Sequence, residues 1–371
     1  MNKKYIAVVL LFSGLFIFST LLSYAFNIYR QIYVGDQEEG KPFIVEADAT
    51  PTPTPDPLGP KNILLLGYGG AGHEGGLLTD TIIVAHIVPR QNQVFLISIP
   101  RDIALPLPIK KDGEENLKVN HAYAIGSDNI NYKNKPDEFS GEAGGGNLAK
   151  YALKQITGLD MNYFVSVNFD GFKNIITNLG GVSVYIPYTF DDKFYPVKGL
   201  ENETCGKSEE DIAALTATLS ANLLEREFQC RYETLHFDKG QQLLDSESAL
   251  KFVRSRHSEI NGGDFGRSQR QQALLIAIKN KLISYKSITK IIPIVNSIAK
   301  NLRTDINFTE AFDLAKDQGD FTDIKIETIS LSTDNVLSEA YGVGGQYVLI
   351  PRNGENKWEV IHEFIRENLQ R

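Results

Sequence analysis

Arginine side chains gather in one short part of the chain. Arg254 and Arg256 lie two residues apart, and Arg267 and Arg270 follow a short distance downstream. Guanidinium groups this close together repel each other unless something anionic lies among them, and the planar fork of each group matches phosphate oxygens bidentately. The pattern predicts a phosphate-binding site, with a solvated basic face as the alternative.

The wider segment from Lys251 to Lys281 is basic in an otherwise acidic protein. It holds seven Lys and Arg residues and two acidic residues, whereas the chain of 371 residues has a formal net charge of −8. Asp264, Arg267, Arg270 and Gln271 fall on one face of the helix expected there, and Asp264 lies near its N-terminus, where an anion meets free backbone amides. The local reversal of charge indicates an anionic ligand, and the overall charge argues against a nucleic-acid partner.

A glycine-rich segment runs from Gly67 to Gly76 and is followed by Thr79-Asp80-Thr81. Glycines let a backbone approach a ligand and point amide groups at an anion, although the same composition suits a flexible surface loop. The segment is not a P-loop, because no Gly-Lys-Ser/Thr follows it. Asp80 begins a buried strand directly after the loop, so its carboxylate is expected at the rim of a sheet, as a Mg²⁺ ligand or as a turn cap.

Two further polar segments follow expected strands. Arg101 and Asp102 come directly after Ser98-Ile99-Pro100, where a strand ends. They form either a surface ion pair of little consequence or an anion-binding group beside a cation-binding group. Lys118 lies in a short polar stretch and would by default be a solvated lysine.

Apolar runs and helical periodicities alternate through the folded part of the chain. Unbroken apolar runs predict strands at 62–67, 81–88 and 94–99, the last two joined by a short turn. Helices are expected at 148–157, 172–179, 245–253, 268–284 and 358–369, with further strands at 163–169 and 182–186. The order predicts an α/β fold with a central mixed β-sheet flanked by helices. Residues 286–371 are either a subdomain or an extension of the same sheet.

The N-terminal part of the chain predicts a membrane anchor. Lys3 and Lys4 precede an apolar run over residues 5–26, long enough to cross the hydrocarbon core as a helix. Basic residues before the run place residues 1–4 in the cytoplasm and the rest outside; a cleaved signal peptide is the rival interpretation. Residues 27–60, acidic and then rich in Pro and Thr, are expected to be an extended linker that lifts the domain from the bilayer.

The two cysteines, Cys205 and Cys230, both follow the expected anchor. In an oxidising compartment a pair at this separation is most simply a disulfide. A zinc site would need more Cys or His at ligand spacing. We therefore expect a structural disulfide within an inserted segment, residues 201–232.

The polar segments, in their order, resemble the LytR-CpsA-Psr (LCP) family of bacterial cell-wall glycopolymer ligases. The matching stretches lie between about residues 60 and 285, and they are Asn62-Ile-Leu-Leu-Leu-Gly67, Thr79-Asp80-Thr81, Ser98-Ile-Pro-Arg-Asp102, Lys118-Val-Asn120, Leu179-Gly-Gly-Val182, Gly240 to Ala249, Val253-Arg-Ser-Arg256 and Asp264 to Gln272. An LCP-like catalytic domain is thus expected over residues 61–285.

The resemblance implies a reaction and a site. Enzymes of this family pass a glycan phosphate from a polyprenyl-pyrophosphate carrier to a peptidoglycan hydroxyl, with Mg²⁺ beside the pyrophosphate. The residues that fall on pyrophosphate-binding positions, or beside them in the same helix, are Arg101, Lys118, Arg254, Arg256, Arg267, Arg270 and Gln271. Arg101 is also expected to act in catalysis, Asp80 falls on a metal position, and Asp264 is a candidate base or an orienter of the arginines.

One departure from the family bears on the metal. Many members carry Gly-x-Asp-x-Arg after the first strand, whereas this chain has Gly67-Tyr68-Gly69-Gly70-Ala71. A second carboxylate ligand is missing there, and Asp102 or Glu74 is the candidate replacement. Two other functions stay open: a hydrolase that cleaves the same lipid-linked pyrophosphate, and a non-catalytic wall protein that uses the arginines to bind lipid or glycan.

Overall fold

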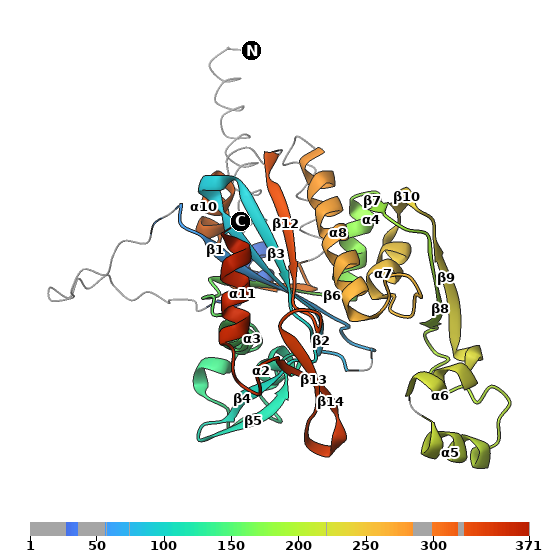
Figure 1. Cartoon of the computed structure of the whole chain (residues 1–371). Helices are drawn as coiled ribbons and strands as arrows, with labels where there is room; N and C mark the ends of the chain where they lie inside the picture. Colours follow the sequence, from blue (N-terminus) through green and yellow to red (C-terminus); the bar gives the residue numbers. More distant parts are fainter. Residues whose placement is uncertain are drawn as a thin grey trace, which may run out of the picture. The chain divides into compact units, whose positions relative to one another are not determined.

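The computed structural model describes residues 27–35, 56, 58–73, 75–219, 221–284, 299–317 and 323–370 (Figure 1). The chain forms two compact units. Unit 1 comprises the chain up to Asn178 and from Tyr285 onward, and unit 2 comprises Leu179–Ser284. Each unit has buried apolar residues of its own.

A six-stranded sheet forms the centre of unit 1, in the order β11-β6-β1-β2-β3-β12. β1 pairs in parallel with β6 and antiparallel with β2, and β3 pairs antiparallel with β2 and in parallel with β12, so the sheet is mixed as predicted. The strands span Lys61–Tyr68 (β1), Thr79–Val88 (β2), Gln93–Ser98 (β3), Tyr163–Asn168 (β6), Leu302–Thr304 (β11) and Lys325–Ser330 (β12).

The sequence explains these strands closely. In β1, alternate residues are buried, with Leu64 and Leu66 at 0% and 3% exposure. β2 carries a run of buried residues on both faces, as an unbroken apolar strand should. Val88 faces Gln93 where β2 turns into β3, and Asn92 adopts the left-handed conformation that closes the turn.

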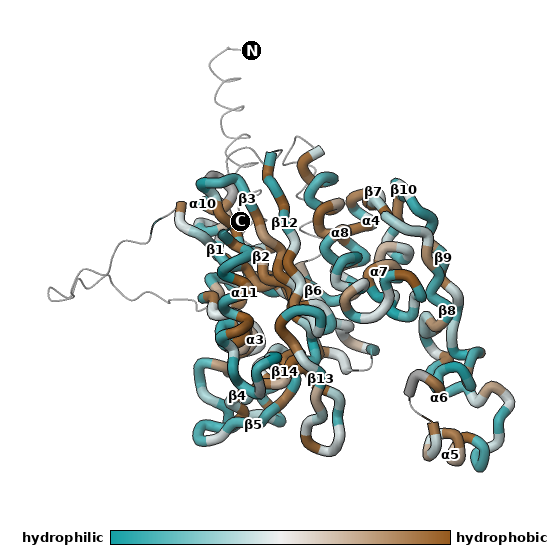
Figure 2. The backbone as a smooth tube through the Cα atoms, viewed as in Figure 1, coloured by the Kyte–Doolittle hydropathy of each residue, from teal (hydrophilic) through white to brown (hydrophobic). Residues whose placement is uncertain are grey.

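Helices from distant parts of the chain cover this sheet. α2 (His121–Ser127), α3 (Gly144–Thr157) and α11 (Glu359–Leu369) contribute buried residues to one apolar core with the strands. Leu148 and Ile361 are completely buried in that core. Figure 2 shows the hydrophobic stretches gathered along the central strands, with hydrophilic residues on the outer turns.

The other elements among the described residues of unit 1 are two hairpins and shorter helices. β4 (Ala104–Lys110) pairs with β5 (Gly113–Lys118), and β13 (Leu337–Tyr341) pairs with β14 (Tyr347–Pro351). α4 spans Phe169–Asn178 and α10 spans Phe308–Asp317, with 3₁₀ turns at Pro89–Gln91, Asp137–Phe139 and Val343–Gly345.

The expected domain end at residue 285 is wrong. β11 and β12 belong to the central sheet and pair with β6 and β3, and α11 packs into the same core. A central sheet with exposed β6 and β3 edges would leave backbone groups unpaired. The chain therefore leaves unit 1 after Asn178 and returns to it, and β11, β12 and α11 extend its sheet and core rather than forming a subdomain.

The expected linker over residues 27–60 is also wrong at its start. Residues 27–32 are helical, and Tyr33 forms a parallel bridge with Thr304 of β11. The Val34 amide donates to the Thr304 carbonyl oxygen at 2.9 Å, and Val34 is 7% exposed in the core. An apolar side chain at the end of a helix gains free energy by covering the sheet edge, so residues 27–35 are part of unit 1.

The anchor expected at residues 5–26 lies outside the described residues. Within the described ranges, no helix is long and apolar enough to cross a bilayer.

Unit 2 contains two antiparallel strand pairs and four α-helices. β7 (Val182–Ile186) pairs with β10 (Gly240–Leu244), and β8 (Phe190–Pro196) pairs with β9 (Tyr232–Phe237). The helices are α5 (Glu209–Thr218), α6 (Ala221–Glu227), α7 (Ser246–Arg254) and α8 (Gly263–Ser284), with a 3₁₀ turn at Gln229–Arg231. Phe237 packs between Phe190 and Phe252, with ring centroids 5.2 and 5.3 Å away, and fixes β8 and β9 to α7.

The predicted disulfide is present. Cys205 and Cys230 are bonded, with Cα atoms 5.7 Å apart. The bridge closes a loop that contains α5, whose residues are all at least partly exposed. Since that loop buries little of its own surface, the disulfide stabilises it where an apolar core is lacking.

Candidate functional site

In unit 1 the predicted site residues form an alternating chain of charges. Arg101 pairs with Asp80 through Nη1 and lies 3.5 Å from Asp102 through Nε. Lys118 Nζ donates to Asp102 Oδ1 at 2.7 Å. We name Asp80, Arg101, Asp102 and Lys118 the unit 1 cluster; the structure brings together all four predicted residues.

Burial differs along the unit 1 cluster. The Asp102 side chain is 9% exposed and Lys118 is 15% exposed, whereas Asp80 is 40% exposed. A buried carboxylate needs a partner, and Asp102 has two cations. The two hairpins fix the position of Asp102. Its carbonyl oxygen accepts from the Leu349 amide of β14 at 2.9 Å, and Lys118, which binds its carboxylate, is the last residue of β5. Asp80 is thus the carboxylate of this cluster that a ligand can reach.

His121 adjoins this cluster at the first position of α2. Burial lowers its pKa, and the charge of Lys118 also lowers it, whereas a hydrogen bond with the Lys118 backbone and the charge of Asp102 act in the opposite direction. The imidazole is therefore neutral near pH 7. No motif in the sequence singled out His121, which is the first residue of α2.

In unit 2 the predicted residues meet where α7 ends and α8 begins. Asp264, in the first turn of α8, accepts from Arg256 and lies 2.9 Å from Arg267 Nη2. Arg256 and Asp264 are each about one-third exposed, while the Arg267 side chain is 8% exposed. Two guanidinium groups thus share one carboxylate at the N-terminus of a long helix, where backbone amides favour an anion.

Arg254 is held by a tyrosine. Its Nη1 donates to Tyr195 Oη at 3.1 Å, and its guanidinium carbon lies 5.5 Å from the centre of the Tyr195 ring. A cation over an aromatic face is stabilised by the electron density of the ring. Tyr195 belongs to β8, far from Arg254 in sequence, and the sequence offered no signal for the pairing.

Arg270 and Gln271 take different positions from the other predicted ligands. Arg270 is 5% exposed, and it donates to the Ser255 carbonyl and, at 2.9 Å, to the Asn261 carbonyl. Burial lowers its pKa to about 10, while the charge of Asp192 opposes this effect. Gln271 is 9% exposed beside the Val253 carbonyl. Arg270 therefore holds the loop between α7 and α8, and we assign it a positioning role rather than direct contact with a ligand.

Asp192 organises the same loop and was missed in the sequence. It is completely buried and accepts from Ser255 Oγ at 2.7 Å, from the Arg256 amide at 2.9 Å and from the His257 amide at 3.1 Å. Burial alone would raise the pKa of this carboxyl, but these hydrogen bonds outweigh it and lower the pKa. A buried carboxylate that accepts from the Ser255 hydroxyl and from the next two backbone amides fixes where the Arg256 side chain starts.

The arginines Arg254, Arg256, Arg267 and Arg270, with Asp264, are called the unit 2 cluster below. The structure gathers them around one loop, as predicted, and the Asp264 carboxylate is placed between two guanidinium groups rather than apart from them. That position favours orienting the arginines over accepting a proton.

The described residues fit Mg²⁺ only in part. Within the described ranges no group of three or more His, Cys, Asp or Glu residues could hold a metal ion. Glu74 lies outside the described residues, and Asp102 is engaged by two cations. A Cβ atom at Gly69 would lie 2.8 Å from the His73 Cβ, so the loop as folded leaves no room for an aspartate there. Asp80 fits an ion that takes one protein carboxylate and completes its shell with phosphate and water, but not an ion held by protein alone.

The fold of each unit and the two clusters define an α/β protein with a cluster of arginines. The LytR_cpsA_psr family model matches residues 18–357, and the chain belongs to this family.

Curated relatives carry names that describe a transferase. The chain is 28% identical over 276 residues to the polyisoprenyl-teichoic acid–peptidoglycan teichoic acid transferase TagV of Bacillus subtilis, covering 74% of this chain and 56% of TagV. It is 26% identical over 296 residues to the transferase TagU of Bacillus cereus, covering 79% of this chain and 77% of TagU. The chain therefore spans little more than half the length of the first of these relatives.

A solved structure supports the fold. The crystal structure of B. subtilis TagV superposes with a TM-score of 0.54 at 26% identity, covering 84% of this chain and 98% of that chain.

Proposed function

We propose that this protein is a phosphotransferase that moves a glycan phosphate from a polyprenyl-pyrophosphate carrier to a hydroxyl group of peptidoglycan. The observation that carries the proposal is the unit 2 cluster, in which arginines outnumber the carboxylate that two of them share. The names of the relatives support the same donor and acceptor.

The reaction needs positioning and charge neutralisation more than covalent chemistry. The acceptor oxygen attacks the phosphorus that bears the glycan, the bond from that phosphorus to the bridging oxygen breaks, and polyprenyl phosphate leaves. The proton of the hydroxyl passes to a carboxylate or to water. Arg256 and Arg267 would bind the non-bridging phosphate oxygens, and Asp264 would orient their guanidinium groups. Arg254, bound to Tyr195, would add a third cation.

The unit 1 cluster would bind a phosphate group in a different way. The charges of its two carboxylates and two cations cancel, so an incoming phosphate can bind Arg101 by replacing Asp80 as its ion-pair partner. The freed Asp80 carboxylate would then hold Mg²⁺ together with phosphate oxygens and water. The metal would supply neutralisation of charge on the leaving phosphate.

We further propose that residues 5–26 anchor the chain in the cell membrane, with the N-terminus in the cytoplasm and both units outside. The apolar run and the lysines before it support this placement.

One assay separates this function from its rivals. The full chain in detergent would be incubated with a labelled polyprenyl-pyrophosphate saccharide, with and without peptidoglycan. A transferase labels peptidoglycan and releases polyprenyl phosphate only when the acceptor is present. Equal release without acceptor would make the protein a hydrolase, and binding without any turnover would make it a lipid- or glycan-binding wall protein.

A further inference from the structure

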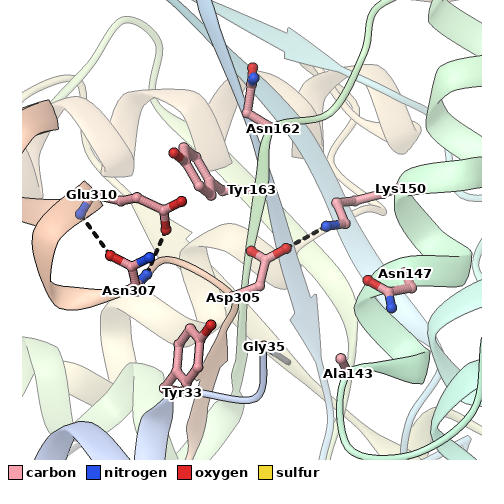
Figure 3. Close-up of a pocket in the computed structure, with 10 residues that line it drawn as sticks. All are labelled: Tyr33, Gly35, Ala143, Asn147, Lys150, Asn162, Tyr163, Asp305, Asn307 and Glu310. Atoms are coloured by element: carbon pink, nitrogen blue, oxygen red, sulfur yellow. Dashed lines mark hydrogen bonds and ion pairs between the residues drawn. The ribbon is translucent and has the colours of Figure 1, made fainter. Parts of the chain in front are cut away.

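A pocket of about 540 Å³ lies in unit 1, away from the unit 1 cluster (Figure 3). Tyr163 lines the pocket and is the first residue of β6, where it pairs with Ile63 of β1. The unit 1 cluster lies near the other end of β1, where Tyr68 pairs with Thr79, the residue before Asp80. Ile63 and Tyr68 are about 17 Å apart at the usual rise of a strand. The pocket is therefore a separate place on the unit, and its volume suits a small-molecule ligand.

The lining combines aromatic rings with planar polar groups. Tyr33 and Tyr163 supply rings, and Asn147, Asn162 and Glu310 supply amide and carboxylate groups. Figure 3 shows these side chains arranged around the pocket from four different parts of the chain. Aromatic rings contact the C–H faces of sugar rings, while amides and carboxylates bind hydroxyl groups in both directions. This mixture is typical of carbohydrate recognition.

The charges of the pocket argue against an anionic ligand. Lys150, its cation, is paired with Asp305, and the other Asp305 oxygen accepts from the Phe164 amide at 2.7 Å. Glu310 adds a second negative charge and caps α10 through the Asn307 amide at 2.8 Å. A phosphate would meet more negative than positive charge here, and a neutral, hydroxyl-rich molecule would not. Lys150 keeps further N–H donors beyond the one that Asp305 uses.

The wall formed by Tyr33 and Gly35 comes from the segment that directly follows the expected anchor. That segment is fixed in place by the hydrogen bond from Val34 to Thr304, and the Tyr33 ring stacks on Tyr29 with centroids 4.9 Å apart. A Cβ atom at Gly35 would lie 2.4 Å from the Tyr33 hydroxyl, so only glycine lets the ring lie where it does. The wall is thus preformed.

We propose that this pocket is a saccharide-binding site, which takes a neutral sugar segment between the juxtamembrane residues and α3. It is independent of the phosphate-binding residues. Its occupant is a glycan portion of either the acceptor or the donor, an assignment that rests on the proposed function.

The test measures binding rather than transfer, so it stands even if the proposed reaction is wrong. Chitotetraose, a neutral oligomer of N-acetylglucosamine, would be titrated into the full chain in detergent by calorimetry. Tyr33→Ala and Asn147→Ala should each weaken binding roughly tenfold, the loss of one good contact. Gly35→Ala should weaken it by displacing the ring without removing it. Tyr188→Ala, at an exposed tyrosine of unit 2, is the matched control and should bind as wild type.

Three outcomes decide the matter. Binding that survives Arg256→Ala but falls with Tyr33→Ala, Gly35→Ala and Asn147→Ala supports the site. Displacement of chitotetraose by a polyprenyl-pyrophosphate saccharide would assign the pocket to the donor glycan, and simultaneous binding would assign it to the acceptor. No binding of chitotetraose, or binding that none of the three pocket substitutions changes, would overturn the proposal.

Discussion

The two clusters combine carboxylates and cations in different proportions. In the unit 1 cluster, Asp80 and Asp102 alternate with Arg101 and Lys118, and each charge has a partner. In the unit 2 cluster, arginines exceed the Asp264 carboxylate. A balanced cluster gains from an anion only by exchanging partners, whereas a cationic cluster gains from it directly. The comparison predicts that the unit 2 cluster binds a pyrophosphate directly, whereas the unit 1 cluster binds an anion only when Arg101 leaves Asp80.

The largest expected effect, on Mg²⁺ binding and turnover, comes from changing Asp80 in the unit 1 cluster. If Asp80 holds Mg²⁺ only after phosphate has taken Arg101, Mg²⁺ should bind poorly to the free protein and well when a polyprenyl pyrophosphate is present. Asp80→Asn should abolish that ligand-dependent binding, measured by calorimetry, and most of the turnover. Asp137→Asn, at a carboxylate that is 89% exposed in the same unit, is the control.

Two results would refine or contradict this account of the metal. A loss of Mg²⁺ binding in Glu74→Gln would show that the glycine-rich loop supplies a replacement ligand. Full transfer by Asp80→Asn in the presence of a chelator would mean that the arginines alone neutralise the pyrophosphate.

Removing the disulfide should separate stability from activity in unit 2. The loop closed by Cys205 and Cys230 contributes about 3 kcal/mol in the chain-entropy description, which depends on the model used. Replacing both cysteines with serine should therefore lower the melting temperature clearly, while transfer at low temperature stays close to wild type. A large loss of activity in a protein that is still folded would place the loop in the site.

Asp192 should matter through the backbone it holds. Asp192→Asn leaves fewer acceptors for the donors from Ser255, Arg256 and His257, and unpaired buried donors cost about 1–3 kcal/mol. Both the melting temperature and the affinity for a polyprenyl pyrophosphate should fall. Asp191→Asn changes the neighbouring, half-exposed carboxylate and should do little. A role in folding alone would lower the melting temperature and leave the affinity unchanged.

The smallest expected effect is a dependence on pH in unit 1. Burial lowers the pKa of His86 and of His121, so the unfolded chain binds protons on these residues more readily than the folded chain. Folding stability should therefore be complete above the ordinary histidine pKa of about 6.5 and should decline as the pH falls below it. Denaturant unfolding at pH 7 and pH 5.5 checks this, and His86→Gln should reduce the slope. Equal stability at both pH values would contradict it.

The sequence predicted what depends on local pattern. Apolar runs located β1, β2 and β3, the spacing of arginines located the loop between α7 and α8, and the cysteine pair located the disulfide. It did not predict contacts between distant segments. Asp192 and Tyr195 hold the arginines from β8, a strand without any motif, and their roles depend on folding.

Two wrong boundaries have the same cause. Residues 27–35 are too short and residues 302–304 too brief to give a periodic signal, yet they pair with each other and close the β6 edge of the sheet. The conformation of a short edge segment is determined by the strand with which it pairs rather than by its own intrinsic propensity. The sequence alone thus predicted the candidate site from its charged segment, whereas the short edge segments of the sheet could be recognised only in the structure.

The central claim is that the unit 2 cluster binds the pyrophosphate through its arginines. It is tested most directly by titrating a polyprenyl pyrophosphate into the full chain with Arg256→Ala, Arg254→Ala and Arg256→Lys, with Lys193→Ala as the control cation on the same unit. Each charge-assisted contact contributes about 1.5–3 kcal/mol, so the alanine variants should bind roughly ten- to a hundredfold more weakly with unchanged melting temperatures. Lysine should restore affinity only in part, because it lacks the planar fork. Wild-type affinity in both alanine variants would contradict the assignment.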